Sequence, residues 1–60
     1  MNRKYFIITI VNDQGDKTQI QRDFSFIETE DSIKISYKKS CAEYNEAMKA
    51  HTSVLNVKEL

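Results

Sequence analysis

Apolar residues occupy both faces of the first predicted strand, residues 4–11 (KYFIITIV). Successive side chains of a strand point to opposite faces, so one face carries Phe6, Ile8 and Ile10. The other face carries Tyr5, Ile7, Thr9 and Val11. A chain of 60 residues can cover one face of a small sheet with a helix but has little sequence left for the second. We therefore expect the second face to contact a partner.

A hairpin turn is predicted at residues 12–16 (NDQGD), because Gly15 can adopt the positive φ of a tight connection. The following residues, 17–27 (KTQIQRDFSFI), alternate in polarity, which is typical of a strand with one solvated face. The apolar positions Ile20, Phe24 and Phe26 share their face with Arg22. A polar row on the other face suits an edge strand, so residues 4–11 are expected at the centre of the sheet.

A helix is predicted over residues 29–51, with Thr29, Glu30 and Asp31 suited to capping its first turn. Capping also accounts for the carboxylates of this junction, Glu28 included, without acid–base chemistry. Helical spacing gathers an apolar stripe, expected to pack on the sheet, of Ile33, Tyr37, Cys41, Tyr44, Ala47, Met48 and His51. Residues 32–38 also alternate in polarity, so the alternative is a strand there before a shorter helix at 39–51.

The last stretch, residues 53–60 (SVLNVKEL), predicts a third strand through Val54, Leu55 and Val57. The whole chain is then one α+β domain, residues 1–60, with the order β-β-α-β. We expect an antiparallel sheet with strand order 2-1-3 and the helix on one face. The predicted core combines Phe6, Ile8 and Ile10, or the alternate set of the same strand, with Phe24, Phe26, Tyr44 and Met48.

Composition narrows the functional classes. Nine basic and nine acidic residues give a formal net charge of zero, which provides no long-range field for nucleic acid or anionic lipid. One cysteine and one histidine do not supply a four-ligand metal site, and Cys41 is expected in the core. His51 lies almost three helical turns beyond Cys41, too far to activate its thiol. We expect no catalytic residues, cofactor or metal.

The N-terminal apolar run is not followed by a small-residue cleavage site, and no stretch approaches the length of a membrane span. A single unpaired thiol suits a reducing compartment, so the cytoplasm is the expected location.

The exposed side of the predicted helix offers a second candidate contact. Ile35 points away from the apolar stripe and lies beside Ala42 among charged residues. Asn45 falls at the boundary between buried and solvated surface, where its amide can both donate and accept hydrogen bonds.

The segment CAEYNEAMKAH (41–51) resembles the helix of Dmd, the antitoxin family of T-even-type bacteriophages. Ala42, Glu43, Asn45 and Ala47, followed by Met48 and a basic residue, carry the resemblance, and VLNV (54–57) is similar to the last strand of that family. The resemblance implies an inhibitor that fills a groove near the active site of an RnlA- or LsoA-type toxin endoribonuclease. Phage messenger RNA then survives in the cytoplasm of the infected bacterium. Asn45, with Glu43 and Ala42, is implied as a partner contact.

Three functions therefore remain as hypotheses. The first is an antitoxin of this kind, which binds a protein and needs no chemistry of its own. The second is a small structural or regulatory protein that associates with itself, and a homodimer is also a hypothesis for the unbound antitoxin. The third is a weak nucleic-acid binder.

Overall fold

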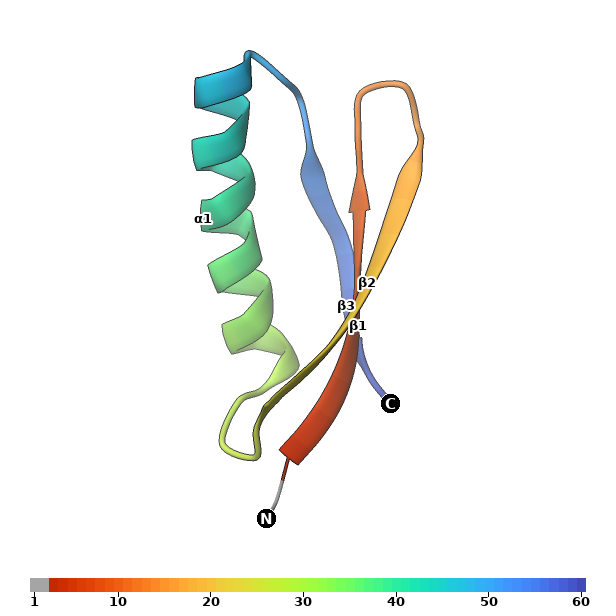
Figure 1. Ribbon diagram of the computed structural model, residues 1–60, viewed down its shortest axis with the longest axis vertical. Helices are drawn as coiled ribbons and strands as arrows, with labels where there is room; N and C mark the ends of the chain where they lie inside the picture. Colours follow the sequence, from red (N-terminus) through yellow and green to blue (C-terminus); the bar gives the residue numbers. More distant parts are fainter. Residues whose placement is uncertain (1–2) are drawn as a thin grey trace.

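The computed structural model describes residues 3–60. It contains β1 (Arg3–Val11), β2 (Lys17–Ser25), α1 (Glu30–Met48) and β3 (Ser53–Glu59), in that order. The three strands form one antiparallel sheet in the order β2-β1-β3, and α1 lies on one face of it (Figure 1). The predicted α+β class, element order and strand order are confirmed. None of the described helices is long and apolar enough to cross a membrane.

The hairpin between β1 and β2 forms where the sequence places it. Gly15 has a φ of 85°, a conformation that costs glycine little. The side-chain oxygen of Asn12 accepts hydrogen bonds from the backbone N–H groups of Gln14 and Asp16, both at 2.9 Å. These bonds fix the turn, and the two strands then pair without a register shift from Val11 and Lys17 to Arg3 and Ser25.

The helix begins at a complete capping box. The hydroxyl of Thr29 accepts from the N–H of Ser32 at 3.1 Å, and the hydroxyl of Ser32 accepts from the N–H of Thr29 at 2.9 Å. The alternative strand at residues 32–38 is wrong, because this segment is the start of α1.

The helix ends three residues earlier than predicted. Lys49 takes the left-handed conformation, with φ of 53°, and its N–H donates to the carbonyl of Asn45. His51 therefore lies outside α1, in the connection to β3, so its predicted place in the helix and in the apolar stripe is wrong.

The core is smaller than predicted. Phe6, Ile8, Ile33 and Val57 form its buried cluster, and Cys41 is also buried, as expected. Phe24 packs against the cluster, with its ring edge-on to Phe6 at a centroid separation of 5.6 Å.

Three residues expected in the core lie at the surface instead. Phe26 follows the end of β2, in the turn before α1, and is exposed. Tyr44 is 52 % exposed and Met48 is 64 % exposed, although both belong to the predicted stripe of α1. The stripe is therefore buried or half-buried from Ile33 to Cys41 and exposed from Tyr44 onward.

The position of α1 explains this difference. α1 runs beside β3, while β2 lies on the far side of β1 (Figure 1). Two hydrogen-bonded ties hold α1 to β3. At one end, Asn45 bonds to Thr52 just before β3, and at the other end Glu30 accepts from the N–H of Glu59 at 3.0 Å. The helix thus covers the β3 side of the sheet and leaves the β2 side partly open.

Candidate partner-binding site

A groove lies between α1 and β2, on the side of the sheet that the helix only partly covers. Its volume is about 330 Å³, and it is lined by Ile10, Thr18, Tyr37, Ser40, Cys41, Tyr44 and Thr52. Ile10 is half-buried and forms part of the floor, while Tyr37 and Tyr44 lie two turns apart on one face of α1. We call this feature the α1–β2 groove. Its lining is aromatic and aliphatic with hydroxyl groups, a composition typical of surfaces that bind apolar side chains.

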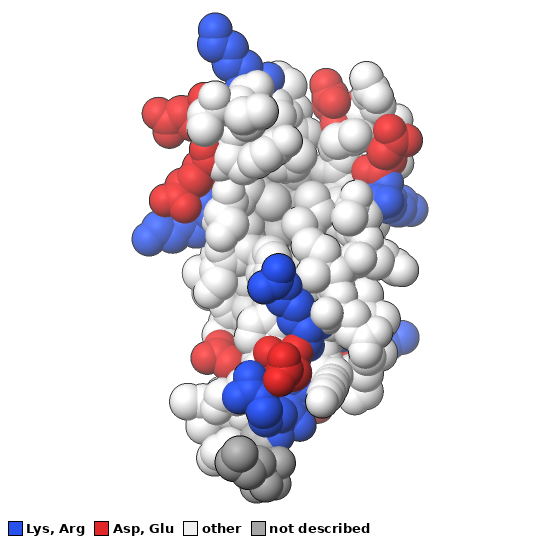
Figure 2. Space-filling view, viewed as in Figure 1, with Lys and Arg blue, Asp and Glu red and all other residues white. Residues whose placement is uncertain are grey.

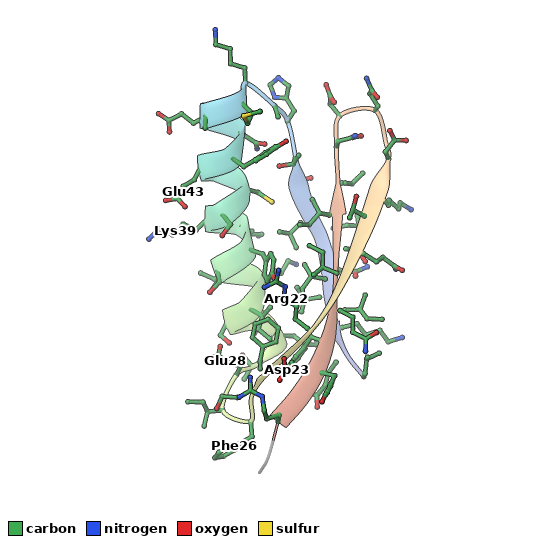
Figure 3. All side chains as sticks on the ribbon, in the orientation of Figure 1. Arg22, Asp23, Phe26, Glu28, Lys39 and Glu43 are labelled. Atoms are coloured by element: carbon green, nitrogen blue, oxygen red, sulfur yellow. The ribbon has the colours of Figure 1, made fainter. Side chains whose placement is uncertain are left out.

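A second hollow continues along β2 from Tyr37. It has a volume of about 570 Å³ and is lined by Tyr5, Gln21, Arg22, Asp23, Phe24 and Tyr37. Figure 2 shows charged side chains gathered toward the ends of the molecule and the outer flank of α1, with a largely uncharged strip between. Arg22 reaches into the space between α1 and the sheet (Figure 3). No carboxylate of residues 3–60 lies within ion-pairing distance of this arginine.

The groove is the feature that sequence reasoning missed. The predicted stripe includes Tyr37 and Tyr44, and both side chains do lie on the face of α1 that is directed toward the sheet. Their exposure depends on where the helix axis lies across the three strands, and the spacing of apolar residues carries no information about that.

The outer face of the sheet, opposite α1, carries the four β1 residues that were predicted as partner contacts. No helix or strand of residues 3–60 covers this face. Tyr5 is 47 % exposed, and Ile7 and Val11 are half-buried by neighbouring side chains. Thr9 is only 4 % exposed, so in this structure it offers little area to a partner, and its assignment as a partner contact stays a prediction. It lies directly between Gln19 and Asn56 of the neighbouring strands, beside the β-bulge of β3, and these neighbours cover it.

One ion pair crosses this outer face at the β2 edge. Arg3 Nε donates to Asp23 Oδ2 at 2.7 Å, between two half-exposed side chains. That hydrogen bond, together with the charge of the guanidinium, holds the pKa of the Asp23 carboxyl below its ordinary value. The pair therefore orients both side chains next to Tyr5 without burying a charge.

The exposed side of α1 carries three further predicted contacts. Ile35 is 69 % exposed, and Ala42, two turns further along the helix, is exposed as well. Glu43 and Lys39 point away from the sheet on the outer flank of the helix (Figure 3). These residues form a surface separate from the α1–β2 groove.

Asn45 has partners inside the chain. Its Nδ2 donates to the carbonyl of Thr52 at 2.9 Å, and its Oδ1 accepts from the N–H and the hydroxyl of Thr52 at 2.8 and 2.7 Å. A structural role, the attachment of α1 to the start of β3, thus accounts for this side chain. Asn45 and Ala42 also line a hollow of about 300 Å³ on the β3 flank of α1.

The turn between β2 and α1 presents two adjacent apolar side chains, Phe26 and Ile27, and both are exposed. Figure 3 shows Phe26 at the end of the molecule, below the first turn of α1. The turn is ordered by a bond from the N–H of Glu28 to the carbonyl of Ser25 at 3.0 Å, and Glu28 accepts from the hydroxyl of Ser32 at 2.8 Å. The sequence pattern placed Phe26 in a strand and therefore did not reveal this surface.

Within residues 3–60, no three His, Cys, Asp or Glu side chains come close enough together to hold a metal ion. Cys41 is buried, and His51 is exposed in the connection after α1. In comparisons with known proteins, the chain matches no family model, and no curated protein or solved structure shows significant similarity to it.

Proposed function

We propose that this chain is an inhibitor that binds another protein, specifically an antitoxin that blocks the RNA-cleaving site of an RnlA- or LsoA-type bacterial toxin endoribonuclease. The observation that carries the proposal is the α1–β2 groove. A single helix tied to β3 leaves apolar side chains of β1 and α1 open along β2, and a second polypeptide can cover them.

The choice of toxin class rests on the resemblance of residues 41–51 and 54–57 to Dmd. The β-β-α-β order that accompanies this resemblance agrees with the fold. Steric blocking requires a rigid surface of apolar anchors and no catalytic group, and Tyr44 provides such an anchor at the mouth of the groove. Action on a host ribonuclease places the inhibitor in the cytoplasm of the infected bacterium.

Co-expression with RnlA or LsoA tests this proposal. We expect the chain to restore growth of toxin-arrested cells and to form a stable complex with the toxin in solution. Charged substitutions then identify the contact surface: Tyr44→Glu in the groove, Tyr5→Glu on the outer sheet face and Ile35→Glu on the outer side of α1. Each position is about half exposed or more, so none of these changes should lower the melting temperature by much.

We expect Tyr44→Glu to weaken toxin binding by at least about tenfold, because a charge at a buried interface anchor must be desolvated. Gln14→Glu, in the exposed hairpin turn, adds the same charge away from all three surfaces and serves as the matched control. A wild-type chain that neither binds either toxin nor restores growth contradicts the proposal. Loss of binding only in Tyr5→Glu or Ile35→Glu moves the contact to that surface.

A further inference from the structure

The two edge strands of the sheet, β3 and β2, differ in whether their unpaired backbone groups are free to bond to another strand. The β3 edge has a bulge opposite Thr9 and Ile10, and the N–H of Glu59 is capped by the carboxylate of Glu30 at 3.0 Å. β2 pairs with β1 in unbroken register along all 9 of its residues, and it contains no proline. Bulges and covered groups prevent the addition of another strand, whereas a long regular edge permits it. β2 is therefore the edge suited to strand addition.

Backbone hydrogen bonds at the ends of the sheet show which residues of β2 direct their N–H and C=O groups away from β1. The N–H of Asn12 donates to the carbonyl of Asp16 at 3.0 Å, and the N–H of Leu60 donates to the carbonyl of Tyr5 at 2.9 Å. Backbone groups alternate sides along an antiparallel strand, so the even-numbered residues of β2 bond to β1. The backbone groups of Gln19 and Gln21 consequently point away from β1, where no other strand of residues 3–60 lies.

We propose that β2 pairs with the β2 strand of a second copy of this chain, antiparallel about a two-fold axis at Ile20. The two sheets then join into one. In this register Ile20 faces its own symmetry mate, Gln19 faces Gln21 of the other copy, and Lys17 faces Asp23 of the other copy. The backbone N–H and C=O groups of Gln19 and Gln21 point away from β1, so they form the central hydrogen bonds of the pairing.

Charge complementarity selects both the second copy and this register. Asp23 Oδ2 accepts from Arg3, and Oδ1 remains for the ammonium group of Lys17 from the other copy. Arg22 lies opposite the small polar Thr18 and diagonal to Asp16 of the other copy. A register centred on Gln21 instead puts Lys17 opposite Ser25 and Arg22 opposite Ile20, which pairs no charges.

Sedimentation equilibrium of the purified chain at micromolar to millimolar concentrations tests this proposal without any toxin. We expect a reversible dimer in the wild-type chain. Gln21→Pro removes an N–H that bonds only across the proposed interface, since β1 does not use it. We expect an increase of about thirty-fold in the dimer dissociation constant, because two symmetric backbone hydrogen bonds are lost. The melting temperature of the monomeric protein at high dilution should change little.

A charge exchange provides a second variant that does not depend on tolerance of proline. Lys17→Asp places two carboxylates opposite each other and should weaken the dimer, and Lys17→Asp with Asp23→Lys should strengthen it again. A wild-type chain that stays monomeric throughout, or a dimer that Gln21→Pro leaves unchanged, overturns the proposal. Loss of toxin binding in Gln21→Pro by a chain that is always monomeric assigns the edge to a strand of the toxin instead, and this also overturns it. Failure of the toxin assay alone leaves the dimer measurement as it stands.

Discussion

The two edge strands of this sheet, β3 and β2, both direct apolar residues toward the helix, but the helix buries these residues to very different degrees. On the β3 side, Val57 lies under α1 beside Ile33 and is buried. On the β2 side, Ile20 and Phe24 remain half-buried and Arg22 is exposed. The difference does not come from hydrophobicity, since Ile20 and Phe24 are at least as apolar as Val57.

The asymmetry arises from polar contacts at the two ends of α1. Asn45 holds the C-terminal end to Thr52, and Glu30 holds the N-terminal end to Glu59, so both ties connect the helix to β3. An α-helix with its side chains is about 10–12 Å across, and neighbouring strands are about 4.8 Å apart, so a displaced helix uncovers a strand. Polar ties thus decide which apolar residues this chain buries and which it leaves open for a partner.

Truncation of one aromatic residue on β1 and one on β2 should give the largest effects and tests how well the helix covers β2. Phe6→Ala should lower the free energy of unfolding by about 3–5 kcal/mol, because Phe6 is fully buried and its loss leaves a cavity. Phe24→Ala should cost about 1–2 kcal/mol, since it loses the edge-on contact with Phe6 and only part of its burial. Urea unfolding of the two variants measures both values. Equal costs would mean that the β2 side is as well covered as the centre of the sheet.

Removal of the C-terminal tie should have an intermediate effect. Asn45→Ala removes every hydrogen bond from this amide to Thr52 and leaves partly buried backbone groups without partners. We expect a loss of about 1–3 kcal/mol in unfolding free energy. Amide hydrogen exchange should accelerate first in the connection between α1 and β3. Glu43→Ala, an exposed position on the same helix, is the control, and a similar loss there would contradict the role of the tie.

The smallest expected effect concerns the Arg3–Asp23 pair on the outer face of β2. The carboxyl pKa of Asp23 is lowered in the folded chain, so the pair stabilises the fold above the ordinary pKa of an aspartate. This contribution disappears as the pH falls through the lowered pKa. In an NMR titration of the carboxyl group, Arg3→Ala should raise the pKa of Asp23 toward its ordinary value. An unchanged titration would show that the ion pair does not persist in solution.

Periodicity and turn chemistry predicted most of the fold correctly. The alternation in residues 17–25, the glycine at position 15 and the polar start of the helix are local signals, and each acts within a few residues of chain. The errors concern Phe26, Tyr44, Met48 and His51, and they occur where an element ends or leaves the sheet. A left-handed Lys49 terminates the helix before His51, and a lysine gives no clear stop signal in a sequence.

Some of the candidate binding surfaces were also predictable from the sequence, and others were not. The sequence identified the outward face of β1, and the exposure of Tyr5 and Ile35 agrees with the strand and helix periods. Thr9 is covered by its neighbours on both adjacent strands, and strand register cannot be deduced from one strand alone. Phe26 and Ile27 were read as strand residues, so their exposure at the turn was not expected.

The amino-acid sequence was sufficient to predict the order of the elements and which side chains of a strand share a face, because these follow from local periods of two and 3.6 residues. It left open which face of β1 packs against the helix. Only the tertiary structure decided which side of the sheet the helix covers and which strand edge stays open. Those outcomes depend on contacts between residues far apart in the chain, such as the packing of Ile33 with Val57 and the bond between Glu30 and Glu59. The hydrophobic pattern does not specify that α1 lies beside β3, yet this position creates the α1–β2 groove.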